Sequence, residues 1–165
     1  MTKSSHQTLD IEVDSKKKSP HQLSLLGRAI RYLSNREHSK EELIRKLSPH
    51  AESQEELERV LKQLEEKGLQ SNTRFAESLV RRKSERYGHR RVAEELKRNR
   101  IDSEVTSQLI GQMRLTEFDR AKEIWDKKYG VLATDPKELA RQARFLAGKG
   151  FDADIVLKII RGRVS

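Results

Sequence analysis

The chain of 165 residues carries a formal net charge of +9, and 37% of its residues are charged against 34% that are hydrophobic. This balance suits thin layers of amphipathic helices better than one thick core. Cysteine is absent, which excludes disulfides, thiolate metal sites and cysteine nucleophiles. No segment approaches the roughly 20 apolar residues that span a bilayer. The first residues also lack a segment of signal-peptide type, so we expect a cytoplasmic protein.

Residues 1–21 predict a flexible tail, because they are polar and show no sustained hydrophobic period. A first helix follows, whose apolar residues have the i, i+3, i+4 spacing of one helical face: Leu25, Leu26, Ala29, Ile30 and Leu33. The sequence Ser-Lys-Glu-Glu at 39–42 predicts a capping box and a short second helix, which Pro49 ends. The sequence Ser-Gln-Glu-Glu at 53–56 predicts another capping box and a third helix that stops at Gly68.

The rest of the chain continues as helices. One predicted helix has its apolar face over 75–80 and is interrupted by Gly88. The next helix has its apolar face over 92–96, and Asp102 is predicted to cap the helix that follows. Thr116, the Asp-Pro pair at 135–136 and Asp152 mark the starts of three further helices. Because no segment alternates apolar and polar residues convincingly, the sequence predicts an all-α fold.

Caps and core positions recur along the chain at a period near 50 residues. Asp102 and Asp152 are 50 positions apart, and so are Leu96 and Leu146, while Ser53 precedes Asp102 by 49. This spacing predicts three copies of a three-helix unit, at 22–70, 71–114 and 115–165. Units this small stack into an extended, curved array that presents a long binding surface rather than a deep catalytic pocket.

Residues typical of catalysis do not form a recognisable pattern. The histidines have no ligand-like spacing, and we interpret each one as a solvent-exposed or loop residue: His6, His21, His38, His50 and His89. Acidic pairs lie on charged helix faces, and the Gly-Lys-Gly segment at 148–150 is typical of a helix end rather than a phosphate loop. We therefore expect no enzyme activity, no metal and no cofactor.

Aromatic residues are interpreted mainly as core. Trp125 and Tyr129 lie four positions apart, so they share one helix face, which we expect to pack against the second helix of the third unit. Only Tyr32 and Tyr87 are candidates for exposed rings.

Positive charge is concentrated in one segment. Residues 74–100 hold ten basic and four acidic groups, a net charge of +6 out of the total of +9. This segment is the candidate site for a phosphate backbone or an acidic protein surface. The candidate contact residues are Arg74, Arg81, Arg82, Lys83, Arg86, Arg90, Arg91, Lys97 and Arg98. The alternative is a solvated helix face with local ion pairs such as Arg90–Glu94 and Arg91–Glu95.

Short motifs in this order resemble the RecX family. They are Gly68-Leu69, Phe75-Ala76, Arg86-Tyr87-Gly88, Arg91-Val92, Glu95-Leu96, Arg144-Phe145-Leu146 and Gly150-Phe151. The first unit fits the family's opening pattern with Ala29, Leu33, Arg36, Ser39, Glu42-Leu43 and Lys46-Leu47. Two departures stand out: Ser-Asn at 71–72 replaces a usual acidic pair, and Arg100 stands where the family usually has glycine.

The resemblance implies tandem three-helix repeats that bind the RecA–DNA filament along its groove and inhibit strand exchange and ATP hydrolysis. It makes this chain a non-catalytic, monomeric regulator whose own DNA contact is weak or depends on the filament. One alternative is a stand-alone DNA-binding protein such as a transcription regulator, which would bind DNA without RecA. A purely structural adaptor is the other.

Overall fold

The computed structural model describes residues 22–162, and every regular element in that range is helical, which confirms the all-α prediction. The first unit holds α1 (Leu25–Asn35), α2 (Lys40–Leu47), the short 3₁₀ helix η1 (Ser48–His50) and α3 (Gln54–Glu66). The second holds α4 (Asn72–Lys83), α5 (His89–Arg98) and α6 (Ser103–Leu115). The third holds α7 (Glu117–Lys128), α8 (Pro136–Gly148) and α9 (Ala153–Ile160). The tail predicted at 1–21 lies outside the described residues.

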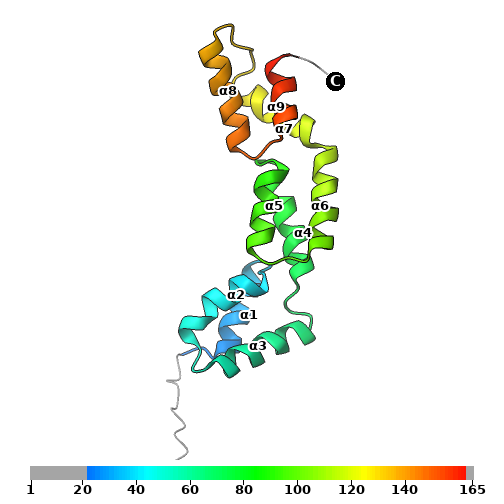
Figure 1. Ribbon diagram of the computed structural model, residues 1–165. Helices are drawn as coiled ribbons and strands as arrows, with labels where there is room; N and C mark the ends of the chain where they lie inside the picture. Colours follow the sequence, from blue (N-terminus) through cyan, green and yellow to red (C-terminus); the bar gives the residue numbers. More distant parts are fainter. Residues whose placement is uncertain (1–21, 163–165) are drawn as a thin grey trace, which may run out of the picture.

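Each unit buries the apolar stripes of its own three helices. The first core cluster runs from Leu25 to Leu64, the second from Phe75 to Met113, and the third from Ala121 to Ile159, and no cluster mixes residues of two units. The units follow one another in an extended column (Figure 1). This arrangement confirms the predicted array of three-helix units, whereas the unit boundaries at 70/71 and 114/115 stay a prediction.

Helix starts are set by local chemistry, as the sequence indicates. Ser39 Oγ accepts a hydrogen bond from the Glu42 amide at 3.0 Å, and Glu42 accepts one from the Ser39 amide at 3.3 Å, so the first predicted capping box is confirmed. The second forms only in part, because Ser53 Oγ caps α3 but the Glu56 carboxylate accepts from the Glu52 amide instead.

Asp152 is the N-cap residue of α9, as its sequence position predicts, but its side chain makes no capping hydrogen bond. Its carboxylate faces the second unit, where Arg90 approaches to 3.2 Å and Arg114 to 3.5 Å. A residue whose sequence position predicts a helix cap therefore contributes to the contact between units.

The predicted contact of the third unit's aromatic residues is confirmed. Trp125 Nε1 donates to Gln142 Oε1 at 3.1 Å, and the Tyr129 ring meets Phe145 edge to face with centroids 5.5 Å apart. Both partners lie on α8, the second helix of that unit.

Candidate binding surface

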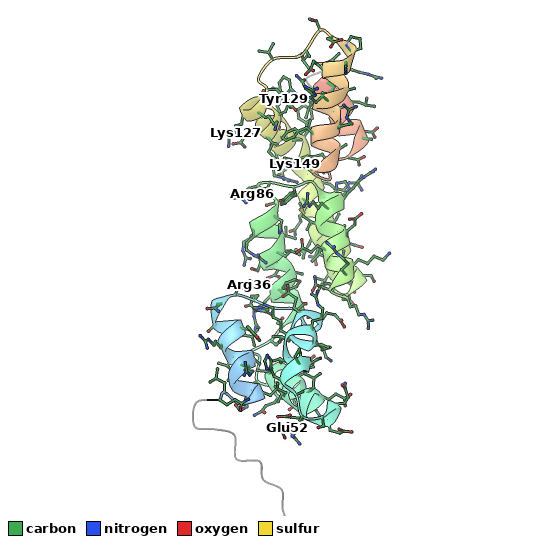
Figure 2. The ribbon with its side chains drawn as sticks, turned by 90° about the vertical axis from the view of Figure 1, so that its left-hand side faces the viewer. Arg36, Glu52, Arg86, Lys127, Tyr129 and Lys149 are labelled. Atoms are coloured by element: carbon green, nitrogen blue, oxygen red, sulfur yellow. The ribbon has the colours of Figure 1, made fainter. Side chains whose placement is uncertain are left out.

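Six of the nine predicted contact residues are exposed and make no ion pair within residues 22–162. One of them, Arg91, lies over an aromatic ring, and the other five are Arg81, Arg82, Arg86, Lys97 and Arg98. Four of them lie in the last turns of α4 and α5, where the negative end of the helix dipole favours cations. Figure 2 shows Arg86 at the level where the second unit meets the third. This group is the basic surface of the second unit, and its charge is available to a partner.

Three other predicted residues are engaged by carboxylates. Arg74 bonds Glu37 of the first unit at 3.0 Å, and Arg90 pairs with Asp152 of the third. Lys83 approaches Glu95 at the long distance of 4.0 Å. The predicted Arg90–Glu94 pair is therefore wrong, because Arg90 reaches across to the next unit instead.

Arg91, the ninth residue, lies over an aromatic ring. Its guanidinium carbon is 4.1 Å from the Tyr87 ring centroid, so the predicted pair with Glu95 is also wrong. An aromatic ring has no net charge, so it does not compensate the charge of the cation above it as a carboxylate partner does. Arg91 therefore adds to the basic surface.

The joint between the second and third units is built on two glycines. The Gly88 amide donates to the Lys149 carbonyl at 2.9 Å, and the Arg90 amide donates to the Gly150 carbonyl at 3.1 Å. A Cβ atom on Gly88 would lie 2.3 Å from both the carbonyl carbon and the oxygen of Gly150. Gly150 itself has φ +89°, a conformation that favours glycine. Only glycine lets the two backbones approach this closely.

A buried histidine–carboxylate pair completes that joint. Glu117 is 1% exposed and accepts from the His89 backbone amide at 3.0 Å and from the His89 ring Nδ1 at 2.5 Å. The interpretation of His89 as an exposed or loop residue is thus wrong, because it is 8% exposed and begins α5. Glu117 takes the place of a side-chain N-cap for α5, supplied by another unit.

Arg120 ties the start of the third unit to carbonyls of the second. Its guanidinium donates to the Ser84 carbonyl at 2.6 Å, to Tyr87 at 2.9 Å and to Met113 at 3.0 Å. Burial lowers the pKa of this guanidinium, while the nearby Glu117 charge raises it. The cation supplies a partner to the Ser84 and Tyr87 carbonyls that follow α4, and a further partner to the Met113 carbonyl near the end of α6, which also accepts from Thr116.

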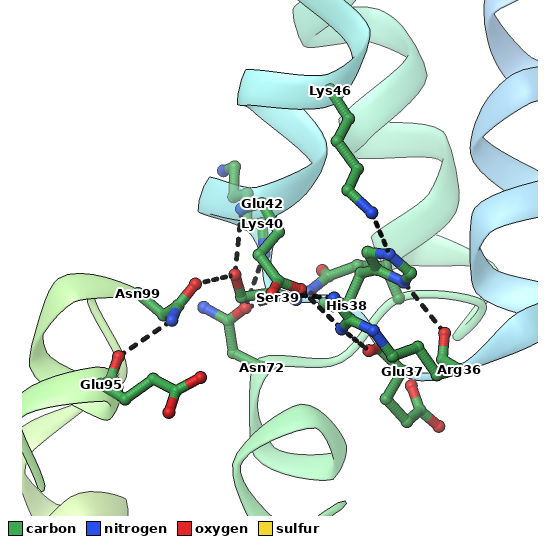
Figure 3. A network of polar contacts seen from close by, with 11 residues as sticks. Arg36, Glu37, His38, Ser39, Lys40, Glu42, Lys46, Asn72, Glu95 and Asn99 are labelled. Atoms are coloured by element: carbon green, nitrogen blue, oxygen red, sulfur yellow. Dashed lines mark hydrogen bonds and ion pairs between the residues drawn. The ribbon is translucent and has the colours of Figure 1, made fainter. Parts of the chain in front are cut away.

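The joint between the first and second units is made by polar side chains (Figure 3). Ser39 Oγ donates to Asn99 Oδ1 at 2.6 Å, and the Asn99 amide donates to the Glu95 carbonyl at 2.9 Å. Asn72 Oδ1 accepts from the Lys40 amide at 2.9 Å. Asn72 belongs to the Ser-Asn pair that departs from the family pattern, so this departure supplies a contact between units.

His38 lies beside this joint in the loop between α1 and α2, so its interpretation as a loop residue is confirmed, although its side chain is buried and only 2% exposed. Its Nδ1–H donates to the Arg36 carbonyl and its Nε2 accepts from the Lys46 ammonium, both at 3.0 Å, because a carbonyl only accepts and an ammonium only donates. Burial lowers the pKa of His38 below its ordinary 6.5, and the charges of Arg36 and Lys46 lower it further. The Arg36 carbonyl and the Glu42 charge act in the opposite direction.

Arg36 and Glu42 form the charged part of the same network. Two guanidinium nitrogens of Arg36 bond the two oxygens of Glu42 at 2.9 and 3.1 Å. Burial by itself raises the pKa of the Glu42 carboxyl, but these bonds and the Arg36 charge outweigh it and hold that pKa below its ordinary value. The start of α2 is therefore held to the α1–α2 loop by a forked ion pair.

Arg100 follows α5 and adopts φ +53°. Gly150 stands 50 positions later, at the matching place after α8, with φ +89°. The left-handed backbone explains why glycine suits this position, and an arginine there carries conformational strain. Its side chain is 81% exposed and lies 3.6 Å from Glu41 of the first unit.

Sequence reasoning missed the residues that join the units, chiefly Glu117, Arg120 and Asn99. In the sequence, each resembles an ordinary surface residue on an amphipathic helix. In the structure, each makes a hydrogen bond to a residue 28 to 60 positions away in another unit. For the two glycines, the sequence predicts a helix interruption at Gly88 and a helix end at Gly150, but not their mutual contact. Within residues 22–162, no group of three or more histidine or acidic side chains is placed to hold a metal ion, and no helix is long and apolar enough to cross a membrane.

Comparison with known proteins agrees with this architecture. Residues 71–109 match the RecX second three-helix domain, and residues 116–160 match the RecX third three-helix domain. The chain is 46% identical over 140 residues to the regulatory protein RecX of Ralstonia pickettii, covering 85% of this chain and 88% of that one. It is 45% identical over 135 residues to the RecX of Neisseria meningitidis serogroup C, covering 82% and 88%.

Solved structures share the fold. The crystal structure of RecX from Lactobacillus salivarius superposes with a TM-score of 0.68 at 19% identity, covering 84% of this chain and 94% of that one. A second crystal structure of a regulatory protein RecX gives a TM-score of 0.70 at 21% identity, covering 84% and 71%. With identities above 40% to curated relatives over most of its length, this chain belongs to the RecX family of regulatory proteins.

Proposed function

We propose that this protein binds the RecA recombinase filament on single-stranded DNA and lowers its ATPase and strand-exchange activities without catalysing a reaction itself. Membership of a family of regulatory proteins supports the role. The observation that carries the proposal is the basic surface of the second unit, mounted at the centre of an extended array. An array of stacked units can contact successive subunits of a helical filament, which a compact domain of the same length cannot.

The basic surface divides the predicted contacts into two kinds. Arg81, Arg82, Arg86, Lys97 and Arg98 make no ion pair within residues 22–162, so a partner's phosphates or carboxylates would not compete with an internal partner. Arg91 is held over a ring and keeps its charge, and Lys83 has only a distant carboxylate. Arg74 and Arg90 hold units together, and we assign them a supporting part in binding through the shape of the array.

A non-catalytic role fits the arrangement of the acidic and histidine side chains. The His89–Glu117 pair has the composition of an acid–base pair, yet Glu117 is 1% exposed and both of its oxygens are occupied by His89. A general acid or base must reach a substrate proton. We therefore assign this pair to the joint, and we include a cytoplasmic location and a monomeric state in the proposal.

The test is ATP hydrolysis by the cognate RecA on single-stranded DNA during titration with this protein. We expect a dose-dependent fall in rate. The variant Arg81→Glu/Arg82→Glu should need a several-fold higher concentration for the same fall, because it repels the filament's phosphates or acidic groups. The control Arg45→Glu/Arg59→Glu changes the charge equally on exposed residues of the first unit and should match the wild type.

Unchanged hydrolysis with the wild-type protein would contradict the proposal. Sequence-specific, salt-sensitive DNA binding without RecA would then favour the stand-alone DNA-binding alternative. If the protein neither bound DNA nor affected RecA, the structural adaptor would be favoured.

A further inference from the structure

A row of cations held on aromatic rings crosses the joint between the second and third units. The Tyr87 ring lies at its centre, with Lys83 Nζ 5.2 Å and Arg91 Cζ 4.1 Å from the ring centroid. Lys149 of the third unit approaches the same ring to 5.4 Å. One aromatic side chain therefore gathers cations from both units.

The row continues along the third unit. Lys149 also lies 5.2 Å from the Phe145 centroid, and Lys128 lies 4.6 Å from the same centroid. Lys128 is 5.9 Å from Tyr129, which packs edge to face against Phe145. Figure 2 shows Lys149 at the joint and Tyr129 further along the third unit. The cation–aromatic row consists of Lys83, Tyr87, Arg91, Lys149, Phe145, Lys128 and Tyr129.

The rings position these cations without neutralising them. Within residues 22–162, Arg91, Lys149 and Lys128 make no ion pair, and Lys83 has only the 4.0 Å approach of Glu95. A ring face attracts a cation through its quadrupole and leaves the net charge intact. Elsewhere on the surface, Lys62 pairs with a neighbouring glutamate, so its charge is largely compensated.

Spacing makes the row act as one positive track. Cations that share a ring lie no more than about 11 Å apart, because each is within 5.4 Å of the shared centroid, and the Debye length in 0.1 M salt is about 10 Å. Their fields therefore overlap. A polyanion with regularly repeated charges matches such a track better than a single acidic residue does.

Side-chain chemistry favours a nucleic-acid strand over an acidic protein. Three of the four cations are lysines, which bind phosphate as point charges and lack the fork that suits carboxylates. The rings of Tyr87, Phe145 and Tyr129 are half-buried rather than fully covered, and the Arg91 guanidinium is planar and exposed. Aromatic rings and guanidinium planes between cations are the features on which unpaired bases stack.

We propose that the cation–aromatic row binds single-stranded nucleic acid, with phosphates on Lys83, Lys149 and Lys128 and bases against the rings and the Arg91 plane. This inference deepens the proposed function. It rests on that function in one respect, because we take the single strand that the row binds in the cell to be the DNA strand of the RecA filament. It moves the expected strand contact from the second unit alone to the joint between the second and third units.

The test measures binding of a fluorescein-labelled oligothymidylate by fluorescence anisotropy at a series of KCl concentrations, with the full chain and without RecA. The variant Lys128→Gln/Lys149→Gln should bind more weakly. Its slope of log affinity against log salt should be shallower by about 1.4, because each phosphate contact on a single strand contributes about 0.7. The control Lys62→Gln/Lys127→Gln removes the same charge from lysines that have carboxylate partners, and its slope should equal the wild-type slope.

A second variant tests the ring. Phe145→Leu keeps the charge and most of the apolar bulk, so it should weaken binding while leaving the salt slope unchanged. Thermal melting followed by circular dichroism should give wild-type curves for both double variants, because Lys62, Lys127 and Lys128 are exposed and the half-buried Lys149 makes no ion pair within residues 22–162.

Equal slopes for the two double variants would overturn the inference, and so would equal competition by a duplex of the same length. Failure of the proposed function is separate, because it is measured by RecA ATP hydrolysis. If the wild-type protein inhibits RecA but the row variants bind oligothymidylate normally, the row is refuted and the filament role stands.

Discussion

Replacing Gly88 by alanine should separate the third unit from the second. Gly88 has φ −77°, which alanine adopts freely, so the effect comes only from the close approach of Gly150. The added Cβ would lie 2.3 Å from the Gly150 carbonyl, and backbone atoms cannot move aside as a flexible side chain does. The backbone segments at Gly88 and Gly150 must therefore move apart.

The size of the effect follows from the bonds that cross the joint. Two backbone hydrogen bonds would be lost, those from the Gly88 and Arg90 amides, at about 1 kcal/mol each. The next residue, His89, also makes its buried contacts with Glu117, and losing a hydrogen bond to a charged group costs a further 1.5–3 kcal/mol or so. We expect the free energy of unfolding to fall by about 2 kcal/mol if only the backbone bonds break, and by about 3.5–5 kcal/mol if the Glu117 contact breaks too.

Urea unfolding with two probes measures this loss. Trp125 is the only tryptophan and lies in the third unit, so its fluorescence follows that unit, whereas far-ultraviolet circular dichroism follows all helices. In Gly88→Ala we expect the fluorescence transition to occur at lower urea than the dichroism transition. Uncoupled units unfold separately, as in other repeat proteins.

Gly111→Ala is the matched control. A Cβ atom on Gly111 would have no neighbour within 4 Å, and the residue lies inside α6. This variant should gain up to about 1 kcal/mol from helix propensity. If Gly88→Ala unfolded at the wild-type urea concentration with coincident transitions, the reasoning from the glycine contact would be refuted.

Three further predictions concern single residues. Arg100→Gly should raise the free energy of unfolding by about 0.5–1 kcal/mol, because removing the strain of the left-handed backbone outweighs the conformational freedom that glycine adds to the unfolded chain. Urea titration measures this change, and a lower urea midpoint than that of the wild type would contradict it. Glu117→Ala should lower the same free energy by at least about 2 kcal/mol, because it leaves buried donors of His89 without an acceptor; wild-type stability would refute the assignment. The pKa of His38 is lowered in the folded protein, so the unfolded chain binds the proton more readily. The contribution of neutral His38 to the free energy of unfolding is therefore fully present above pH 6.5 and should be lost as the pH falls through the folded pKa. Urea midpoints from pH 7.5 down to about pH 5 should fall less in His38→Gln than in the wild type, with the exposed His50→Gln as control.

The two joints differ in how far local sequence patterns reveal them. At the joint of the second and third units, the Arg-Tyr-Gly and Gly-Phe motifs contain the contacting glycines, although the contact itself cannot be read from spacing. At the joint of the first and second units, the contacts come from Ser39, Asn72 and Asn99, which look like caps or surface residues. A Ser side chain that caps its own helix can also bond a neighbouring unit, and only the assembled structure reveals the second partner.

The interpretation of His89 and the predicted Arg90–Glu94 pair are wrong for a related reason. His38 and His89 occupy sequence contexts rich in charged residues, which favour a surface interpretation, yet both are buried at joints. Arg90 has a glutamate four positions later, which favours a pair within one helix, yet it bonds Asp152. An exposed i,i+4 pair contributes only a few tenths of a kcal/mol, so a better-placed carboxylate from another unit readily replaces it.

The sequence by itself determined the helices, most of their caps, the recurrence near 50 residues and the family, because these depend on hydrophobic period and on contacts within a few positions. It also located the excess positive charge, since charge adds up without reference to structure. Only the tertiary structure decided which cations are compensated, as Arg74 and Arg90 are, and which remain available, as Arg81 and Lys149 do. Contacts between units join residues 28 to 62 positions apart. Such contacts depend on the direction in which each unit stacks on the next, and no local pattern encodes that direction.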